Sequence, residues 1–259
     1  MKQQIKSFIL VLKYSRLNPV VIFRVYVGYF SDRNKLKKEL KKFPDFSFGR
    51  SYPILTEKYQ ESGTMSGDYF HQDLLVARRV FVNNPVRHID IGSRTNGFVA
   101  HVASFREIEI YDIRPQQSTV KNIIFKQADL INLQADLINS CDSISSLHAI
   151  EHFGLGRYGD PIDPNGHLKA IGNIYLMLKP KGKFYFSGPI GPQRIEFNAH
   201  RVYSIQYLLD IFHNKFEIEH FSFVDDTGDL HENEALTSEL IENNCNCTYG
   251  CGIFELKKM

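Results

Sequence analysis

The sequence has few cysteines, no large excess of one charge and no long uninterrupted apolar run, and each absence excludes a class of protein. Four cysteines in 259 residues are too few for a disulfide scaffold, so a reducing compartment fits better. The 31 Lys and Arg nearly balance the 29 Asp and Glu, which gives no reason to expect nucleic-acid binding. The most apolar region, residues 8–30, is broken by charges and by Pro19, which argues against a membrane span or a signal peptide. We therefore expect a cytoplasmic protein that binds no nucleic acid and has no integral membrane span.

The composition instead favours a globular protein with a sizeable core. Apolar residues make up 43% of the chain and charged residues only 23%, a balance that argues against disorder. Residues 1–65 are expected to form a helical N-terminal extension, because they are apolar and basic and end in a run of cations between Arg33 and Lys42. This run is most simply one face of a solvated helix, and peripheral contact with a membrane surface is the alternative. Residues 66–259 are expected to form the main domain.

Strand-like and helix-like periods alternate along the main domain. Apolar residues at helical spacing predict a helix over residues 68–81, with Phe70, Leu74, Ala77 and Phe81 on its buried face. Further helices are expected at residues 98–105 and 168–178. Seven strands are expected at residues 88–91, 108–111, 123–125, 143–147, 184–187, 216–223 and 252–256. This alternation is typical of a doubly wound α/β sheet.

In such a sheet a ligand binds at the carboxyl ends of the strands, so the residues that follow each strand are the candidate site. Gly92 and Gly97 follow the first strand and permit a tight turn with close approach of the backbone to a ligand. Asp112 follows the second strand and suits a carboxylate that binds both hydroxyls of a ribose. Asp129 follows the third strand, where it can accept a hydrogen bond from the exocyclic amine of an adenine. Residues 148–152 follow the fourth.

This succession resembles the class I S-adenosylmethionine-dependent methyltransferases, whose pattern is a glycine loop, an acid after the second strand and an aspartate after the third. LHAIEH at 147–152 and LKPKGKF at 178–184 are similar to two further motifs of that family. The resemblance covers about residues 68–257 and implies a Rossmann-like, seven-stranded sheet whose last strand is antiparallel. It also implies that S-adenosyl-L-methionine is the cofactor, bound by nine residues at the strand ends: Asp90, Gly92, Ser93, Arg94, Gly97, Asp112, Asp129, Leu130 and His148. The loop differs from many members in lacking a middle glycine, since Ser93 and Arg94 stand in the turn.

Four longer strings resemble an uncharacterised methyltransferase-like family that is often encoded with bacterial capsule and O-antigen biosynthesis enzymes. The strings are YFHQD at 69–73, DIGSR at 90–94, HAIEHFGLGRYGD at 148–160 and EFNAHR at 196–201. This resemblance implies O-methylation of a sugar, with the acceptor activated as a sugar nucleotide.

Methyl transfer to a hydroxyl needs alignment and removal of the hydroxyl proton. A sugar hydroxyl is a poor nucleophile at neutral pH, and an imidazole with a pKa of about 6.5 is a suitable proton acceptor. His152 and His200 are therefore the candidate bases, and Asp160 is the third catalytic candidate. The alternative for each histidine is a packed or capping role.

The acceptor is expected to be held by polar and basic side chains. Asp160 and Asn198 are the candidates for binding sugar hydroxyls, and three arginines are the candidates for binding a diphosphate: Arg157, Arg194 and Arg201. No resident metal is expected, although a metal-dependent version of the reaction would use Asp160 or Asp163 as ligands.

Two rival functions stay open from the sequence. A nicotinamide-dependent oxidoreductase could use a related sheet, although the usual G-x-G-x-x-G loop is absent. A non-catalytic scaffold of a polysaccharide assembly complex is the second rival, and the many polar residues at the strand ends argue against it.

Cys245, Cys247 and Cys251 are close enough together for zinc, but no fourth ligand stands beside them, so we expect buried thiols.

Overall fold

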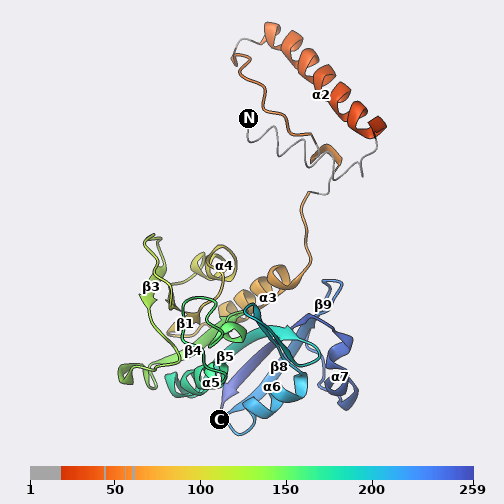
Figure 1. Ribbon diagram of the computed structural model, residues 1–259. Helices are drawn as coiled ribbons and strands as arrows, with labels where there is room; N and C mark the ends of the chain where they lie inside the picture. The colour runs from red at the N-terminus through yellow and green to blue at the C-terminus, as the bar shows by residue number, and fades with distance from the viewer. Residues whose placement is uncertain (1–18, 44, 56, 60–61) are drawn as a thin grey trace. The chain divides into compact units, whose positions relative to one another are not determined.

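Figure 1 shows the computed structural model, which describes residues 19–43, 45–55, 57–59 and 62–259. Contacts between residues group the chain into two compact units, Met1–Thr64 and Met65–Met259. Each unit has buried apolar residues of its own. The first part of the apolar region at residues 8–30 lies outside the described residues.

The smaller unit is built on one long helix, α2 (Pro19–Glu39), which continues into a 3-10 turn, η1 (Leu40–Lys42). The chain then returns beside α2 (Figure 1), and a second 3-10 turn, η2 (Glu57–Tyr59), follows. Val25 and Leu55 form the buried contact between these segments, and three partly buried side chains surround it: Ile22, Tyr26 and Tyr29. None of the helices in the described ranges has the length and apolarity that a membrane span requires.

The larger unit is an α/β protein with a central sheet in the order β3-β2-β1-β4-β5-β10-β8-β9 (Figure 1). The five parallel strands are β1 (His88–Ile91), β2 (Ile108–Asp112), β3 (Ile123–Gln127), β4 (Cys141–Leu147) and β5 (Leu178–Ile190). The last strand, β10 (Gly250–Lys258), lies antiparallel between β5 and β8 (Phe216–Val224). This confirms the Rossmann-like sheet with an antiparallel last strand.

The sheet has one strand more than the seven predicted. The chain turns back after β8 through hydrogen bonds to the carboxylate of Asp225, and two residues, β9 (Leu230–His231), then pair with β8. His231 stacks on Phe223 with ring centroids 4.3 Å apart, which holds this short hairpin in place. A two-residue strand has too little apolar alternation to be visible as a strand in the sequence.

The remaining elements connect and cover these strands. The helices are α3 (Asp68–Asn83), α4 (Ala100–Ala103), α5 (Gly166–Met177), α6 (Ile205–Phe212) and α7 (Ser238–Glu242). The single turns of helix are η3 (Thr95–Val99), η4 (Ala135–Leu137), η5 (Ile150–His152) and η6 (Asn244–Asn246). A separate antiparallel pair, β6 (Arg194–Glu196) and β7 (His200–Val202), follows β5.

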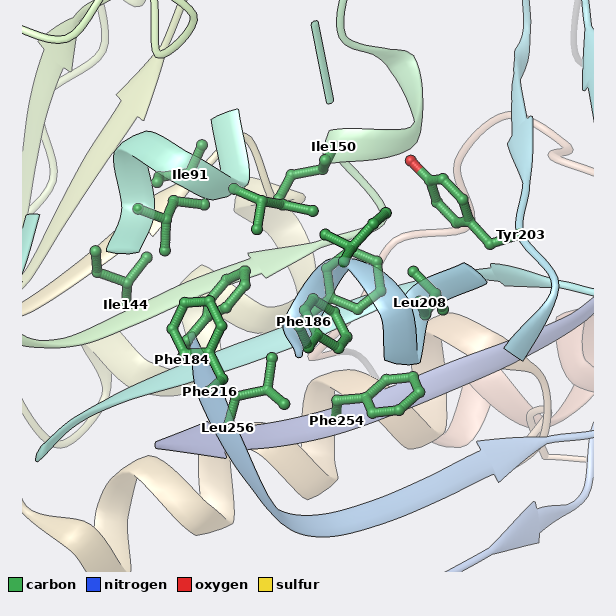
Figure 2. Close-up of a cluster of buried hydrophobic side chains, with 14 of the residues drawn as sticks. Ile91, Ile144, Ile150, Phe184, Phe186, Tyr203, Leu208, Phe216, Phe254 and Leu256 are labelled. Carbon is green, nitrogen blue, oxygen red and sulfur yellow. The ribbon is translucent and has the colours of Figure 1, made fainter. Parts of the chain in front are cut away.

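Side-chain alternation along the strands divides the core of the larger unit into two clusters, one on each face of the sheet. Phe184 and Phe186 of β5 belong to one cluster, whereas Tyr185 belongs to the other, because successive side chains of a strand point to opposite faces. The first cluster packs under α5 and α6, and Figure 2 shows its aromatic centre. The second cluster packs against α3 and α4. The result is a three-layer α/β/α unit.

Helix α3 buries a different face from the one predicted. Ala77 is buried as predicted, but Phe70, Leu74 and Phe81 are 39%, 51% and 63% exposed, whereas Gln72 and Asp73 are buried. Gln72 faces inward because its Oε1 accepts a 2.5 Å hydrogen bond from the buried Ser187 hydroxyl of β5. The residue before the helix is Gly67, and no side chain forms a capping hydrogen bond there. Most of the predicted apolar face was wrong, because α3 turns Gln72 toward Ser187 of β5 and Asp73 toward the loop after β1.

All four cysteines are free thiols and are buried: Cys141, Cys245, Cys247 and Cys251. The prediction of buried thiols is confirmed. Burial raises the pKa of the Cys245 and Cys247 thiols to about 12, so these sulfur atoms stay protonated at neutral pH.

Candidate functional site

Two cavities open where the carboxyl ends of β1, β2 and β4 meet, and they share six residues. The apolar cavity is lined mainly by Tyr111, Ile113, Ala128, Leu130, Ile131 and Phe153. The polar cavity, of about 560 Å³, is lined by arginines, histidines and tyrosines, including Arg94, Arg157, His200, Tyr69 and Tyr249. The six shared residues are Gly92, Asp112, Arg114, His148, His152 and Tyr158.

Asp90 holds the turn that follows β1. Its carboxylate is fully buried and accepts hydrogen bonds from the amide of Ser93 at 3.0 Å and from the hydroxyls of Ser93 and Ser145 at 2.6 Å. Burial raises the pKa of Asp90 to about 6, although these hydrogen bonds oppose the shift. Gly92 is in the left-handed region with φ of 70°, and a Cβ there would lie 3.0 Å from the Cβ of Ala149. The turn therefore needs glycine at this position.

The second glycine of the loop serves a contact inside the protein. A Cβ on Gly97 would lie 2.1 Å from Oδ2 of Asp73, a buried residue of α3. Burial raises the pKa of Asp73, and hydrogen bonds to the carboxylate from Gln72 and from the backbone of Phe98 oppose the shift. Gly97, inside the helical segment η3, thus leaves room for a carboxylate of α3, and it lines neither cavity.

Asp112, at the end of β2, lies in both cavities and is paired within the protein. Arg114 donates from Nε to Oδ1 at 3.0 Å and from Nη2 to Oδ2 at 2.6 Å, and its amide donates to Oδ1 at 2.8 Å. The same guanidinium lies 4.2 Å from the ring centroid of Tyr158. Both oxygens of Asp112 are therefore engaged by a residue that is itself half exposed.

Asp129 and Leu130 line the apolar cavity after β3. The carboxylate of Asp129 accepts hydrogen bonds from the amide of Ile131 at 2.9 Å and from the side chain of Asn132 at 2.7 Å. Asn173 of α5 donates to the carbonyl of Leu130 at 2.8 Å. These bonds fix the loop that forms one side of the apolar cavity.

A buried carboxylate lies between two histidines after β4. Oε1 of Glu151 is 3.2 Å from Nδ1 of His148 and 3.5 Å from Nε2 of His152. Burial opposes the charged form of His148, but the neighbouring Cys251 and Glu151 hold its pKa well above the ordinary value. Burial likewise opposes ionisation of Glu151, yet the hydrogen bond from His148 lowers its pKa. The pair is therefore charged, and Nε2 of His148 has no hydrogen-bond partner among the described residues.

The backbone of His148 adopts a conformation that residues other than glycine rarely take. Its φ is 49°, in the left-handed region, and its ring packs against that of Tyr69 with centroids 5.2 Å apart. Such conformations persist where surrounding contacts hold them, and they cluster at functional sites.

His152 is held in one tautomer. Nδ1 donates to the carbonyl of Ala199 at 2.6 Å, so Nε2 of the neutral ring carries the lone pair. Burial lowers the pKa of His152, and the Glu151 carboxylate opposes the shift. Arg157 donates to the same carbonyl at 2.9 Å, and its guanidinium lies 5.1 Å from the ring centroid of Tyr158. His152 is thus a neutral imidazole whose free nitrogen lies beside a carboxylate.

The remaining catalytic candidates are placed differently. His200 lines the polar cavity, and its Nε2 is 3.1 Å from the carboxylate of Glu196. Asp160 lines the apolar cavity, but its carboxylate accepts three hydrogen bonds from backbone amides, those of Gly154, Gly156 and Tyr158. Asp160 therefore shapes the loop after β4. Asp163 pairs with Lys169 and with the amide of Asn165.

The structure brings eleven of the sixteen predicted residues into the two cavities. They are Gly92, Ser93, Arg94, Asp112, Asp129, Leu130, His148, His152, Arg157, Asp160 and His200. Asp90 lies beneath the turn, and Gly97 lies behind it. Arg194 pairs with Glu196, Asn198 is exposed on the loop between β6 and β7, and Arg201 is buried.

Arg201 is placed where it cannot reach a ligand in either cavity. Its guanidinium donates to the carbonyls of Glu151, Phe153 and Pro164, with distances of 2.7 to 3.2 Å. It therefore ties β7 to the loop after β4.

Sequence reasoning missed several cavity residues that carry polar or aromatic groups, among them Tyr69, Arg114, Tyr158 and Tyr249. Arg114 could have been found, because it stands two residues after the predicted ribose-binding acid. Tyr69 and Tyr158 lie inside strings that had been noted without a role. Tyr249 carries no local signal, since its position depends on the pairing of β10 with β5.

Comparisons with known proteins agree with this fold. A family model described as "Caenorhabditis protein of unknown function, DUF268" matches residues 97–258. No curated protein matches the sequence. Among solved structures, the chain is similar to the 1,6-didemethyltoxoflavin-N1-methyltransferase of Burkholderia thailandensis, solved with 1,6-didemethyltoxoflavin and S-adenosylhomocysteine bound. The TM-score is 0.52 at 11% identity, over 90% of each chain.

A second similar structure is the 4+2 cyclase SpnF. Its TM-score is 0.50 at 15% identity, over 73% of this chain and 80% of that chain. At these identities the likeness shows the fold alone. This chain has a methyltransferase-like fold, and one protein of similar fold is named for a different reaction.

Proposed function

Since the chain belongs to DUF268, a family of unknown function, its chemistry has to be inferred from its site, and we propose that it is an S-adenosylmethionine-dependent methyltransferase. The observation that carries the proposal is the shared lining of the two cavities. The Gly92 turn, Asp112 and His152 come from the ends of three parallel strands and border one space. This supports a nucleoside-containing cofactor at the turn with a reacting group beside the imidazole.

The residues present fit this cofactor. The apolar cavity suits an adenine, with Asp129 and Leu130 on its side, and Asp112 suits the ribose hydroxyls. His148 has a buried Nε2 without a hydrogen-bond partner among the described residues, which suits a polar group of the ligand. When bound, the cofactor supplies an electrophilic methyl group on a positively charged sulfur.

The acceptor that we propose is a hydroxyl of a sugar nucleotide. Arg94 and Arg157 both line the polar cavity, and neither forms an ion pair with a carboxylate in the described part of the chain. Guanidinium groups without a carboxylate partner suit a diphosphate. Arg194 and Arg201 are occupied by internal partners and drop out of the proposed diphosphate site. A place in capsule or O-antigen synthesis is supported only by the sequence strings at 69–73, 90–94, 148–160 and 196–201.

His152 is the proposed base. Its Nε2 lone pair would accept the proton of the hydroxyl, and the resulting imidazolium would lie 3.5 Å from the Glu151 carboxylate. His148 keeps that carboxylate ionised, so the positive charge formed at His152 has a partner already in place. His200 is the alternative base on the opposite side of the polar cavity.

The test begins with calorimetry of S-adenosylmethionine and S-adenosylhomocysteine binding. We expect the wild-type protein to bind both, Asp112→Ala to lose about tenfold or more in affinity, and the exposed Asp210→Ala of α6 to match the wild type. Failure of the wild type to bind would overturn the proposal. Binding of a nicotinamide dinucleotide in its place would favour the oxidoreductase.

Turnover is then measured with labelled cofactor and a panel of sugar nucleotides. We expect kcat/KM to fall at acidic pH, where His152, whose pKa lies below the ordinary histidine value, becomes protonated. We also expect His152→Gln to lose most turnover while cofactor affinity is retained. If both His152→Ala and His200→Ala keep wild-type turnover, histidine base catalysis is wrong. Methylation of an amine and of no sugar nucleotide would overturn the acceptor and leave the methyltransferase assignment intact.

A further inference from the structure

The smaller unit carries a net positive charge, whereas the larger unit carries a net negative charge. Residues 1–43 contain eleven of the 31 Lys and Arg but only two of the 29 Asp and Glu, so this stretch has a net charge of +9 and the remainder −7. The near-neutral total conceals this asymmetry. A concentrated charge of one sign indicates a partner of the opposite sign.

The two acids of this stretch do not pair with the lysines between residues 35 and 41. Asp32 pairs with Lys58 at 3.3 Å and Glu39 pairs with Lys42 at 2.8 Å. Within the described ranges, no carboxylate pairs with this lysine cluster, which consists of Lys35, Lys37, Lys38 and Lys41, and all four are exposed.

Helix α2 also exposes large apolar side chains. One face packs around Leu55 through Ile22, Val25 and Tyr29, and a different face carries Phe23, Val27 and Phe30 at helical spacing. These three side chains are 71%, 49% and 54% exposed. Further exposed apolar residues follow in the same unit: Leu36, Phe43, Phe46, Tyr52 and Ile54. So many exposed apolar groups in a short segment indicate an interaction surface.

We propose that the smaller unit binds the surface of a membrane containing anionic lipids. Phe23, Val27 and Phe30 would enter the boundary between headgroups and acyl chains, and the lysine cluster of residues 35–41 would lie on the anionic headgroups. The combination favours lipid over the alternatives. A second copy would bring two units of net charge +8 together. The bases of a single-stranded nucleic acid would stack on Phe23 and Phe30 but would leave the exposed aliphatic side chain of Val27 without a matching partner. Apolar and basic contacts together give reversible, salt-sensitive binding.

The experiment is flotation of the full chain with two kinds of vesicle, pure phosphatidylcholine and phosphatidylcholine with about 30% phosphatidylserine. We expect binding to the anionic vesicles only, and loss of that binding at about 1 M salt, where the screening length is about 3 Å. Equal binding to both vesicles, or binding to neither, would overturn the proposal. Single-stranded RNA is added as a competitor, and preferential binding of RNA would also overturn it.

Matched variants separate the two contributions. We expect Lys37→Glu with Lys38→Glu, and separately Phe23→Ser with Phe30→Ser, each to weaken binding about tenfold or more. The controls are Lys121→Glu with Lys179→Glu and Phe81→Ser, which change exposed residues of the larger unit. If the controls weaken binding as much as the variants, the surface of α2 is not the binding site. The salt dependence of the wild type tests the proposal without any variant.

Discussion

Single buried histidines take opposite charge states in this protein, and the reason is the partner that each one meets. His88 is the first residue of β1, and its ring nitrogens lie within hydrogen-bond distance of two hydroxyl groups, those of Ser143 at 2.7 Å and Ser145 at 3.2 Å. Burial lowers the pKa of His88 to about 3. His148 is equally buried but faces the Glu151 carboxylate, so it holds a proton. At His148 the combined influence of Cys251 and the Glu151 carboxylate outweighs desolvation, whereas the two serine hydroxyls at His88 do not.

The low pKa of His88 makes the protein sensitive to acid. The unfolded chain takes up a proton at this residue below about pH 6.5, whereas the folded chain does so only near pH 3, so folding free energy is lost as the pH falls. We expect His88 alone to cost about 3 kcal/mol between pH 7 and pH 4. Urea unfolding of the wild type and of His88→Gln at pH 7 and pH 4 measures this contribution. The free energy of unfolding should fall less in His88→Gln, because the variant lacks the titrating imidazole.

His220 provides the control for this prediction. It is exposed on β8, so His220→Gln should keep the acid sensitivity of the wild type. An equal dependence on pH in the wild type and in His88→Gln would show that His88 does not contribute.

The positions of the strand-end acids could be predicted from the sequence, but their partners could not. Asp112 and Asp129 directly follow apolar runs, and they line the cavities as expected. Arg194 and Arg201 also belong to polar strings near the site, yet one pairs with Glu196 and the other with backbone carbonyls. Long side chains can turn several ways, so their targets depend on tertiary contacts.

At the scale of elements, α3 shows how buried polar contacts can override helical patterning. The spacing of Phe70, Leu74 and Phe81 predicted the buried face, and burying a phenylalanine contributes about 1.5–3 kcal/mol. The helix instead turns Gln72 and Asp73 inward, where they meet Ser187 and the Gly97 backbone. The helix could be predicted from its period, but its orientation depends on polar groups brought from β5 and from the loop after β1.

The contact between α3 and the loop after β1 predicts a coupled pair of mutations. Gly97→Ala would place a Cβ 2.1 Å from Oδ2 of Asp73, and we expect overpacking of about 1–3 kcal/mol. In Asp73→Ala the obstructing carboxylate is gone. The double variant should therefore be more stable than the sum of the two single changes, by about 1 kcal/mol or more.

Thermal unfolding of the four proteins in this cycle measures the coupling. Additive effects of Gly97→Ala and Asp73→Ala would mean that the two residues do not meet. A fifth protein, Gly172→Ala, serves as control, because nothing lies within 4 Å of a Cβ at that position of α5.

At the scale of the molecule, residues 65–259 hold two core clusters and both cavities. We expect a fragment of residues 65–259 to fold by itself, because none of these features needs a residue of the smaller unit. One cooperative thermal transition and dispersed amide signals in an NMR spectrum are the expected results. Aggregated or unfolded fragment would contradict the expectation.

The general architecture could be predicted because seven apolar runs alternate with helical segments. Helix α6 was not anticipated, although Leu208, Ile211 and Phe212 complete the first core cluster. Its apolar residues are followed closely by β8, so the boundary between helix and strand was hidden. The division of charge between the two units was also hidden, because the totals for the whole chain nearly cancel.

The two-residue strand β9 has a consequence for the behaviour of the protein in concentrated solution. A long strand at the edge of a sheet offers a row of unpaired amides and carbonyls to which another chain can add. The hairpin ending at His231 covers the end of β8 from Phe223 to Val224, and its own edge strand, β9, is only two residues long. At the opposite edge, β3 carries Lys126, whose charge disfavours strand addition. The rest of β8, residues 216–222, is not paired with β9, and at that border the charges of Glu217 and Glu219 disfavour strand addition.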